Sequence, residues 1–132
     1  MSALAPEVAM QEIEKWLVHK KVSANKRESN EEAIKTLAEE ISLGNMFLTD
    51  SFNLEYNLKS PIKSEQPTTK LVFKPRLTIG SVYNHLQGVK PTDADGRLFA
   101  YAAALTTNPK DLIKNLEIDD WNIVQAVVVF FL

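Results

Sequence analysis

The sequence predicts an α+β fold that is mostly helical, with five to six short helices and one small antiparallel β-hairpin. Apolar residues recur at helical spacing over most of the chain. Between Ser51 and Lys59 the period changes to two, which is typical of a strand with one buried face. The last forty residues, Asp93–Leu132, carry three successive helix signals and end on a strongly apolar run.

A chain of 132 residues, 45% of them hydrophobic, is long and apolar enough for one domain with a packed core. We therefore expect a single domain over residues 1–132. It divides into an N-terminal helical pair over residues 1–44, a β-hairpin over residues 51–75 and a C-terminal helical unit over residues 78–132.

The first helix is expected over Pro6–Lys20. Its apolar face is formed by Ala9, Ile13, Trp16 and Leu17. The stretch Lys20–Glu28 is polar and basic, which is typical of a solvated turn rather than a phosphate site. Ser29 and Glu32 match the S-x-x-E capping box, and this predicts that the second helix starts after Ser29. Gly44 is placed to end this helix in a left-handed cap.

Two strands are expected next, after a connection at Met46–Asp50. The apolar positions of the first strand are Phe52, Leu54, Tyr56 and Leu58. The second strand is Lys70–Lys74, and the prolines of Ser60–Thr69 predict a loop between the two. We expect Phe52–Leu58 to pair with Leu71–Lys74. A helix should pack on the apolar side of this hairpin, because a lone hairpin is marginal in water.

Thr78 is a favourable N-cap for a third helix that closes at Gly88. The apolar face of this helix is expected to consist of Ile79, Val82, Tyr83 and Leu86. Thr92 and Asp95 offer a looser capping box for a fourth helix over Asp93–Thr106, whose alanines allow a neighbouring helix to approach closely.

Two further helices are expected at the end of the chain. Asn108-Pro109 predicts the N-cap and first turn of a short helix. The last helix is expected from about Ile118, with Asp119 and Asp120 in its first turn, where the helix dipole favours anions. The tail Val127–Phe131 is β-branched and aromatic, so a strand is the alternative there.

Charge and composition argue against several classes of protein. The formal net charge of −2 is unlike that of a nucleic-acid-binding protein, which needs a basic field to neutralise phosphates. The chain has no cysteine, so neither a disulfide framework nor a thiolate zinc site is possible. The N-terminal stretch does not resemble a secretory signal, and the longest apolar run, Ala126–Leu132, is far shorter than a membrane span. We expect a soluble, cytoplasmic protein that binds neither nucleic acid nor membrane.

No pattern of catalytic residues occurs in the sequence. His19 and His85 lie on separate predicted helices, and there is no H-x-x-x-H, G-x-S-x-G or H-E-x-x-H motif. Asp93 and Asp95, followed by Gly96, form only a fragment of a calcium loop. A glycine-rich phosphate loop is lacking as well. We therefore expect no catalytic residue, no metal ligand and no cofactor, and the protein is not predicted to be an enzyme.

Several short motifs occur in an order that is similar to that of a known family. They are Leu58-Lys59-Ser60-Pro61-Ile62, L-x-x-x-P-R-L-T-I-G over Leu71–Gly80, A-A-L-T over Ala103–Thr106, Asn108-Pro109, and a closing pattern of Leu116, Asp120, Phe131 and Leu132. Over about Phe52–Leu132 the chain resembles the small tail assembly chaperones of long-tailed bacteriophages. The region over residues 1–44 is longer than in the shortest members of that family.

This resemblance implies a protein without catalytic activity that acts in the host cytoplasm. Members of the family coat the long tape measure protein, keep it soluble, and help subunits of the tail tube protein to assemble around it. The resemblance provides no residue-level binding site, but aromatic residues dominate interface energies. The candidate contact residues are therefore Tyr83, Phe99, Trp121, Phe130 and Phe131. The alternatives are a structural component of the tail or baseplate and a small-molecule-binding regulator.

We further expect a homo-oligomer, because the chain carries more short amphipathic segments than it can enclose in one core. In the last helix, Trp121 and Val124 are expected to anchor the core. Phe130 and Phe131 lie at the free end, where burial is hardest, so they are expected to form a protein–protein surface.

Overall fold

The computed structural model describes residues 3–132, which form seven α-helices, one 3-10 turn and a three-stranded sheet. The helices are α1 (Pro6–Lys20), α2 (Ala24–Ser29), α3 (Glu31–Ser42), α4 (Ile79–Tyr83), α5 (Ala94–Thr106), α6 (Lys110–Lys114) and α7 (Ile118–Val128), with the 3-10 turn η1 (Asn84–Leu86) after α4. The strands are β1 (Met46–Leu48), β2 (Leu54–Ile62) and β3 (Thr68–Phe73). The predicted fold class, α+β and mostly helical, is confirmed.

The sheet is antiparallel in the order β1-β2-β3, so β2 lies in the middle. Leu54 lies opposite Phe73 and Tyr56 opposite Leu71, which confirms the predicted hairpin. The third strand, β1, pairs Met46 with Tyr56. We predicted a connection at this point, because three residues are too few to show an alternating pattern.

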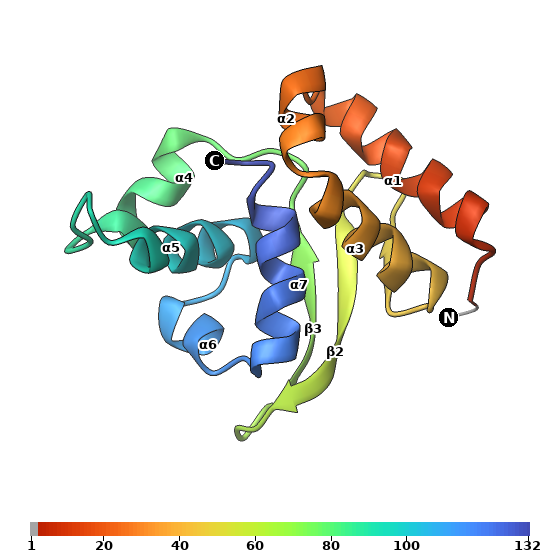
Figure 1. The fold of residues 1–132 in the computed structure, drawn as a ribbon. Helices are drawn as coiled ribbons and strands as arrows, with labels where there is room; N and C mark the ends of the chain where they lie inside the picture. Colours follow the sequence, from red (N-terminus) through yellow and green to blue (C-terminus); the bar gives the residue numbers. More distant parts are fainter. Residues whose placement is uncertain (1–2) are drawn as a thin grey trace.

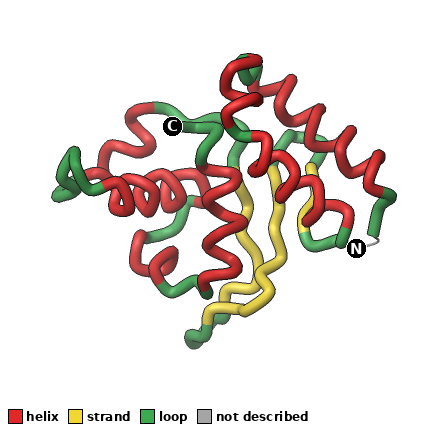
Figure 2. Tube along the Cα trace, viewed as in Figure 1, coloured by secondary structure: helices red, strands yellow, loops and turns green. Residues whose placement is uncertain are grey.

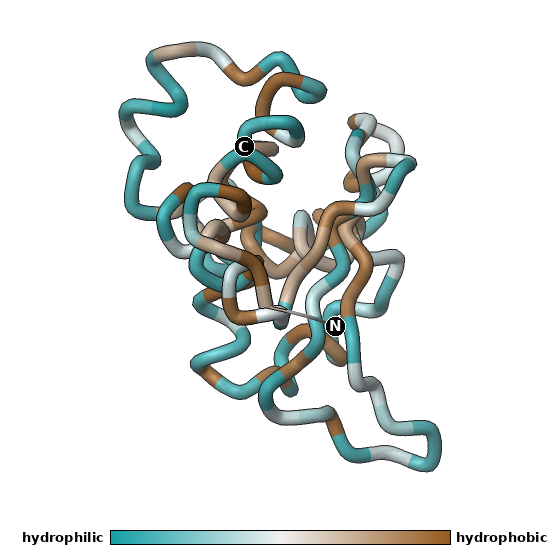
Figure 3. The backbone as a smooth tube through the Cα atoms, turned by 90° about the vertical axis from the view of Figure 1, so that its right-hand side faces the viewer, coloured by the Kyte–Doolittle hydropathy of each residue, from teal (hydrophilic) through white to brown (hydrophobic). Residues whose placement is uncertain are grey.

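One face of the sheet is buried under helices, as the alternating pattern predicted. The buried side chains on this face are Leu54, Tyr56, Leu58, Leu71 and Phe73. Helices α3 and α7 contact each other, and α3 packs on β1 while α7 packs on β2 (Figure 1). The hairpin is longer than predicted, since β2 continues to Ile62 and β3 starts at Thr68. Its tip extends beyond the helices (Figure 2) and is hydrophilic (Figure 3).

The N-terminal region contains three helices rather than the predicted pair. The expected turn over Lys20–Glu28 is wrong, because α2 forms there and the Ser23 side chain accepts the N–H of Lys26 at 3.2 Å. The predicted capping box is also wrong. Ser29 is the last residue of α2, and α3 starts at Glu31 with no side-chain cap. The first helix and its buried face are confirmed, and Gly44 follows α3 with a φ of 84°.

Phe52 was predicted to be the first buried residue of the middle strand, and this is wrong. It lies in the turn before β2 with a φ of 65°, a left-handed conformation in which a strand cannot continue. Its ring stacks on the His19 ring of α1, with the centroids 3.9 Å apart. The alternating pattern in the sequence therefore begins before the strand does, and Phe52 lies outside the strand.

The C-terminal helices match their predicted places, but two caps differ. Thr78 accepts the N–H of Ser81 at 3.1 Å, as predicted. Helix α5 is capped by Asp93, which accepts the N–H of Gly96 at 2.9 Å, rather than by the pair at Thr92 and Asp95. Helix α6 is preceded by Pro109 as its N-cap residue, so the predicted cap at Asn108 is wrong by one position.

Helix α7 starts at Ile118, as predicted, and runs to Val128. The strand considered for Val127–Phe131 is wrong, because helical and turn hydrogen bonds continue to Phe131. The helix crosses one face of the sheet and packs against α5 on one side and α3 on the other (Figure 1).

Candidate protein-binding surfaces

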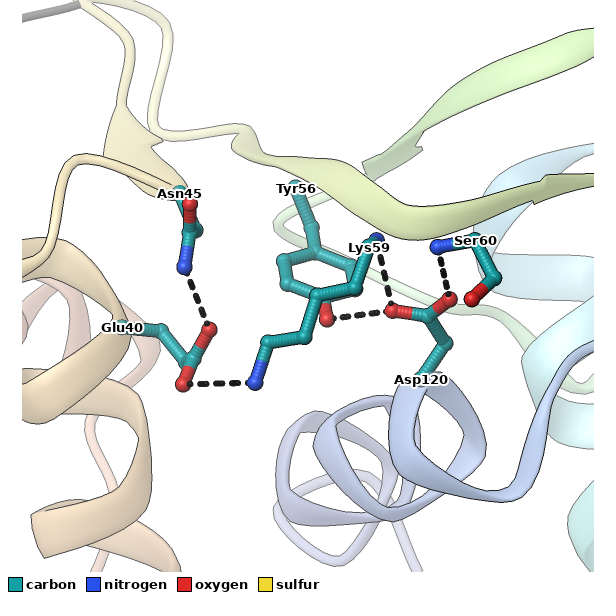
Figure 4. A network of polar contacts seen from close by, with 6 residues as sticks. All are labelled: Glu40, Asn45, Tyr56, Lys59, Ser60 and Asp120. Carbon is teal, nitrogen blue, oxygen red and sulfur yellow. Dashed lines mark hydrogen bonds and ion pairs between the residues drawn. The ribbon is translucent and has the colours of Figure 1, made fainter.

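Asp120, in the first turn of α7, is a fully buried carboxylate with three hydrogen-bond donors. Its Oδ1 accepts the Tyr56 hydroxyl at 2.6 Å and the Lys59 N–H at 2.9 Å, and its Oδ2 accepts the Ser60 N–H at 3.0 Å (Figure 4). Lys59 and Ser60 lie where the register between β2 and β3 shifts. The Asp120 carboxylate therefore accepts the hydrogen bonds of two backbone N–H groups in the irregular part of the sheet.

A second buried carboxylate continues this network toward α3. Glu40 Oε1 accepts Asn45 Nδ2 at 3.2 Å, and Lys59 Nζ lies 3.4 Å from Glu40 Oε2 (Figure 4). Lys59 thus contacts Asp120 through its backbone and Glu40 through its side chain. The network links α3, β2 and α7.

This network stabilises the fold. Burial raises the pKa of the Tyr56 hydroxyl above its usual range, and the hydrogen bond to Asp120 raises it further. The hydroxyl therefore remains a donor, and both groups are shielded from any ligand in solution. From the sequence, Asp120 was predicted to interact with the helix dipole and belonged to the closing pattern of the family resemblance, but its burial was not predicted. The missed signal is that Ile123 and Val124, three and four residues later, place Asp120 on the apolar face of α7.

The other polar residues that the sequence offered as candidate catalytic residues or metal ligands do not form a common site. His19 packs on Phe52, whereas His85 lies in η1. Asp93 is engaged as the cap of α5. Residues 3–132 contain no group of three or more His, Cys, Asp or Glu side chains that could hold a metal ion. Across the same described part of the chain, every helix is too short or too polar to cross a membrane.

The five aromatic residues predicted to make contacts lie in three places. Phe99 of α5 packs on Trp121 of α7, with ring centroids 5.0 Å apart. Phe130 and Phe131 both pack on Trp16 of α1, at 5.6 and 6.1 Å. Tyr83 of α4 is 60% exposed. The prediction that Phe130 forms a free surface is wrong, because only 4% of it is exposed.

Trp121 and Val124 were both expected to anchor the core, but only Val124 does so. Val124 is fully buried, whereas Trp121 is half-buried on Phe99. Phe131 is half-buried as well, and the Lys20 ammonium lies 3.5 Å from the centre of its ring. Burial first, and then the nearby cations Lys26 and Arg76, lower the pKa of Lys20 to about 8.

We define the α4 surface as the exposed side of α4 with the hollow beside it. Ile79 and Tyr83 are four residues apart on one face of the helix and are 84% and 60% exposed. The hollow has a volume of about 120 Å³ and is lined by Leu77, Thr78, Ile79, Val82, Tyr101 and Phe131. This volume is smaller than that of a cavity that holds benzene, about 150 Å³, so the hollow has room for no more than one side chain of a partner. The helix was predicted to bury this face, but only Val82 is buried, against Ala100 and Ala104.

We define the α1 outer face as the side of α1 that points away from α3 and the sheet. Val8 and Val18 are exposed on it, by 42% and 64%. A shallow apolar hollow of about 680 Å³ lies along this face and ends at Phe52; its lining residues are Met10, Gln11, Glu14, Lys15, Val18, His19 and Phe52. Helix α1 lies on the opposite side of the molecule from α4 (Figure 1), so the two surfaces are separate.

Comparison of the chain with protein-family models, with curated protein sequences and with solved structures returned no match.

Proposed function

We propose that the protein is a non-catalytic assembly chaperone that binds an apolar helical partner, in the manner of the tail assembly chaperones that its sequence resembles. The partner is then the tape measure protein, a long rod that needs shielding in the host cytoplasm until the tail tube protein surrounds it. The observation that carries the proposal is the α4 surface, where two large apolar side chains are held in solvent beside a hollow.

The geometry of the α4 surface supports binding of a helix. Ile79 and Tyr83 form a short exposed ridge, and the adjacent hollow has room for about one side chain. An amphipathic helix presents anchors three and four residues apart, so one anchor can enter the hollow while its neighbours pack on the ridge. Large exposed apolar residues near one another mark interaction sites in soluble proteins. Two of the predicted contact residues, Tyr83 and Phe131, belong to this surface.

The presence of two separate apolar surfaces also supports a coating role. A small protein that covers a long rod in several copies needs one surface for the rod and another for the neighbouring copy. The α4 surface and the α1 outer face lie on opposite sides of the molecule (Figure 1), which permits both contacts at once.

The test is co-expression with the tape measure protein encoded in the same genome, with the soluble fraction of that protein as the readout. We expect the wild type to keep it soluble and Ile79→Ser combined with Tyr83→Ser to lose this effect. Ile118→Ser is the matched control, because Ile118 is also strongly exposed, at 73%, but lies at the start of α7. A wild-type chain that leaves the tape measure protein insoluble would overturn the proposal.

A structural component of the particle would share these surfaces, so a second measurement separates the two functions. A chaperone is shed during assembly and is missing from purified particles by mass spectrometry. If the protein is present there in stoichiometric amounts, it is a tail or baseplate component instead.

A further inference from the structure

We infer that the α1 outer face binds the same face of a second copy of this chain, with the two helices antiparallel. The inference uses a surface other than the α4 surface and does not rest on the proposed function. It starts from the spacing of the exposed residues on α1. Val8, Gln11, Lys15 and Val18 follow one another at intervals of three, four and three residues, which is the spacing of a coiled-coil seam.

The two ends of this seam are apolar and its middle is polar. Val8 and Val18 are exposed, and Lys15 is also exposed while it pairs with Glu12 at 2.8 Å. In an antiparallel pair with its two-fold axis at the level of residue 13, Val8 of each copy faces Val18 of the other. Gln11 then faces Lys15, where the amide oxygen can accept a hydrogen bond from the ammonium group. The seam is therefore self-complementary only in the antiparallel arrangement.

The charges on α1 favour the same orientation. Of the charged residues far from the axis, Glu7 lies near the start of the helix and Lys21 directly follows its end, whereas Lys20 is turned onto Phe131. Antiparallel pairing brings Glu7 of each copy to within about 3 Å of the level of Lys21 of the other along the axis, whereas parallel pairing places Glu7 against Glu7 and Lys21 against Lys21. The helix dipoles are also opposed in the antiparallel pair. Near the axis, Glu12 and Glu14 approach their counterparts, but each is already paired, with Lys15 and Arg27 at 2.8 Å.

The hollow along α1 gives the second helix a place to pack. Its lining is apolar over most of its area, and the stacked pair of His19 and Phe52 forms one wall. Helix α1 has 15 residues and is therefore about 22 Å long, so the contact is short. We expect a dimer in the micromolar range rather than an obligate one. Such a dimer leaves both α4 surfaces free.

The first test is sedimentation velocity of the full chain over a series of concentrations. We expect a monomer–dimer equilibrium for the wild type, and Val18→Glu should raise its dissociation constant by at least about tenfold. Val18 is 64% exposed, so this change leaves the core intact. Ile79→Ser, on the α4 surface, should leave the dissociation constant unchanged. A wild type that stays monomeric at every concentration, or a Val18→Glu variant that dimerises as before, overturns the inference.

Engineered cysteines test the orientation, and the chain has no cysteine of its own. In the antiparallel pair, a mixture of Val8→Cys and Val18→Cys chains should form a disulfide between the two variants. Neither variant should cross-link with itself, because its two copies lie about 15 Å apart along the axis and a disulfide needs Cα atoms within about 7 Å. Cross-linking of each variant with itself would show a parallel pair. Absence of any cross-link under oxidising conditions would show that another surface, or another partner, covers this face.

Discussion

The Tyr56 hydroxyl donates a hydrogen bond to the Asp120 carboxylate over 2.6 Å, and both side chains are fully buried. This contact joins the middle strand of the sheet to the first turn of α7. Asp120 also accepts the N–H groups of Lys59 and Ser60, so one side chain serves three residues of β2. Hydrogen bonds to a charged acceptor are about twice as strong as neutral ones. We infer that this contact sets the point at which α7 crosses the sheet.

Replacement of Asp120 should be among the most damaging single changes in the chain. Asp120→Ala leaves the buried Tyr56 hydroxyl and two part-buried backbone N–H groups, those of Lys59 and Ser60, without this partner. We expect a loss of about 3 kcal/mol or more in the free energy of unfolding, measured by urea denaturation. Asp119→Ala is the matched control, because Asp119 is exposed in the same turn and should change stability by less than about 1 kcal/mol. Equal effects of the two changes would mean that the buried network is unimportant.

Stability should fall steeply at alkaline pH because of Tyr56. Its pKa in the folded protein is raised, first by burial and then by Asp120, whereas an unfolded tyrosine titrates near 10. The stabilising contribution is therefore complete below pH 10 and is lost above it, as the unfolded chain releases the proton first. The expected slope is about 1.4 kcal/mol per pH unit. Denaturation curves between pH 9 and 11 should show this fall for the wild type and a shallower one for Tyr56→Phe.

Lys20 should produce the opposite trend at lower pH. Burial and then the cations Lys26 and Arg76 lower its pKa to about 8, from 10.5 in an unfolded chain. Between these two values the unfolded chain binds more protons than the folded one, so stability rises with pH. Lys20→Met keeps the apolar stem on Phe131 and removes the charge. We expect the free energy of unfolding to rise from pH 7.5 to 9.5 for the wild type but not for this variant.

The cap of α2 offers a sharp comparison between two serines. Ser23 accepts the N–H of Lys26, so Ser23→Ala should lower the free energy of unfolding by about 1 kcal/mol. Ser29, predicted from the sequence to be a cap, ends α2 and makes no capping bond to α3. Ser29→Ala should therefore change stability by less than about 0.5 kcal/mol. Denaturation curves of both variants, recorded under the same conditions, decide between the two assignments.

Periodicity predicted the long elements of the fold and failed at the short ones. The faces of α1 and β2 follow from their spacing of apolar residues, because these elements are long enough to repeat their pattern. Helix α2 has no buried residue and β1 has three residues, so neither carries a pattern. Phe52 continues the alternation of β2 but adopts a left-handed turn, and its ring packs on His19 in a distant helix, a contact that periodicity cannot predict.

The candidate surfaces were predictable only in part. Aromatic character singled out Tyr83 and Phe131, which belong to the α4 surface. The exposure of Ile79 was not predictable, because it depends on how α4 packs on α5, an arrangement that buries Val82 but not Ile79. The buried network could be suspected from one carboxylate on an apolar helix face, but its donors lie about sixty residues away in the chain.

Phe130 should prove more important for folding than its place near the end of the chain suggested. Its ring meets the buried Trp16 ring edge-on, with the centroids 5.6 Å apart, and it is 4% exposed. Phe130→Ala should therefore lower the free energy of unfolding by about 3–5 kcal/mol, and deletion of residues 130–132 by at least as much. Phe131→Ala and Trp121→Ala, at half-buried rings, should each have a smaller effect in the same urea titration. If the truncated chain keeps wild-type stability, the contact between Phe130 and Trp16 does not hold the end of α7 against α1.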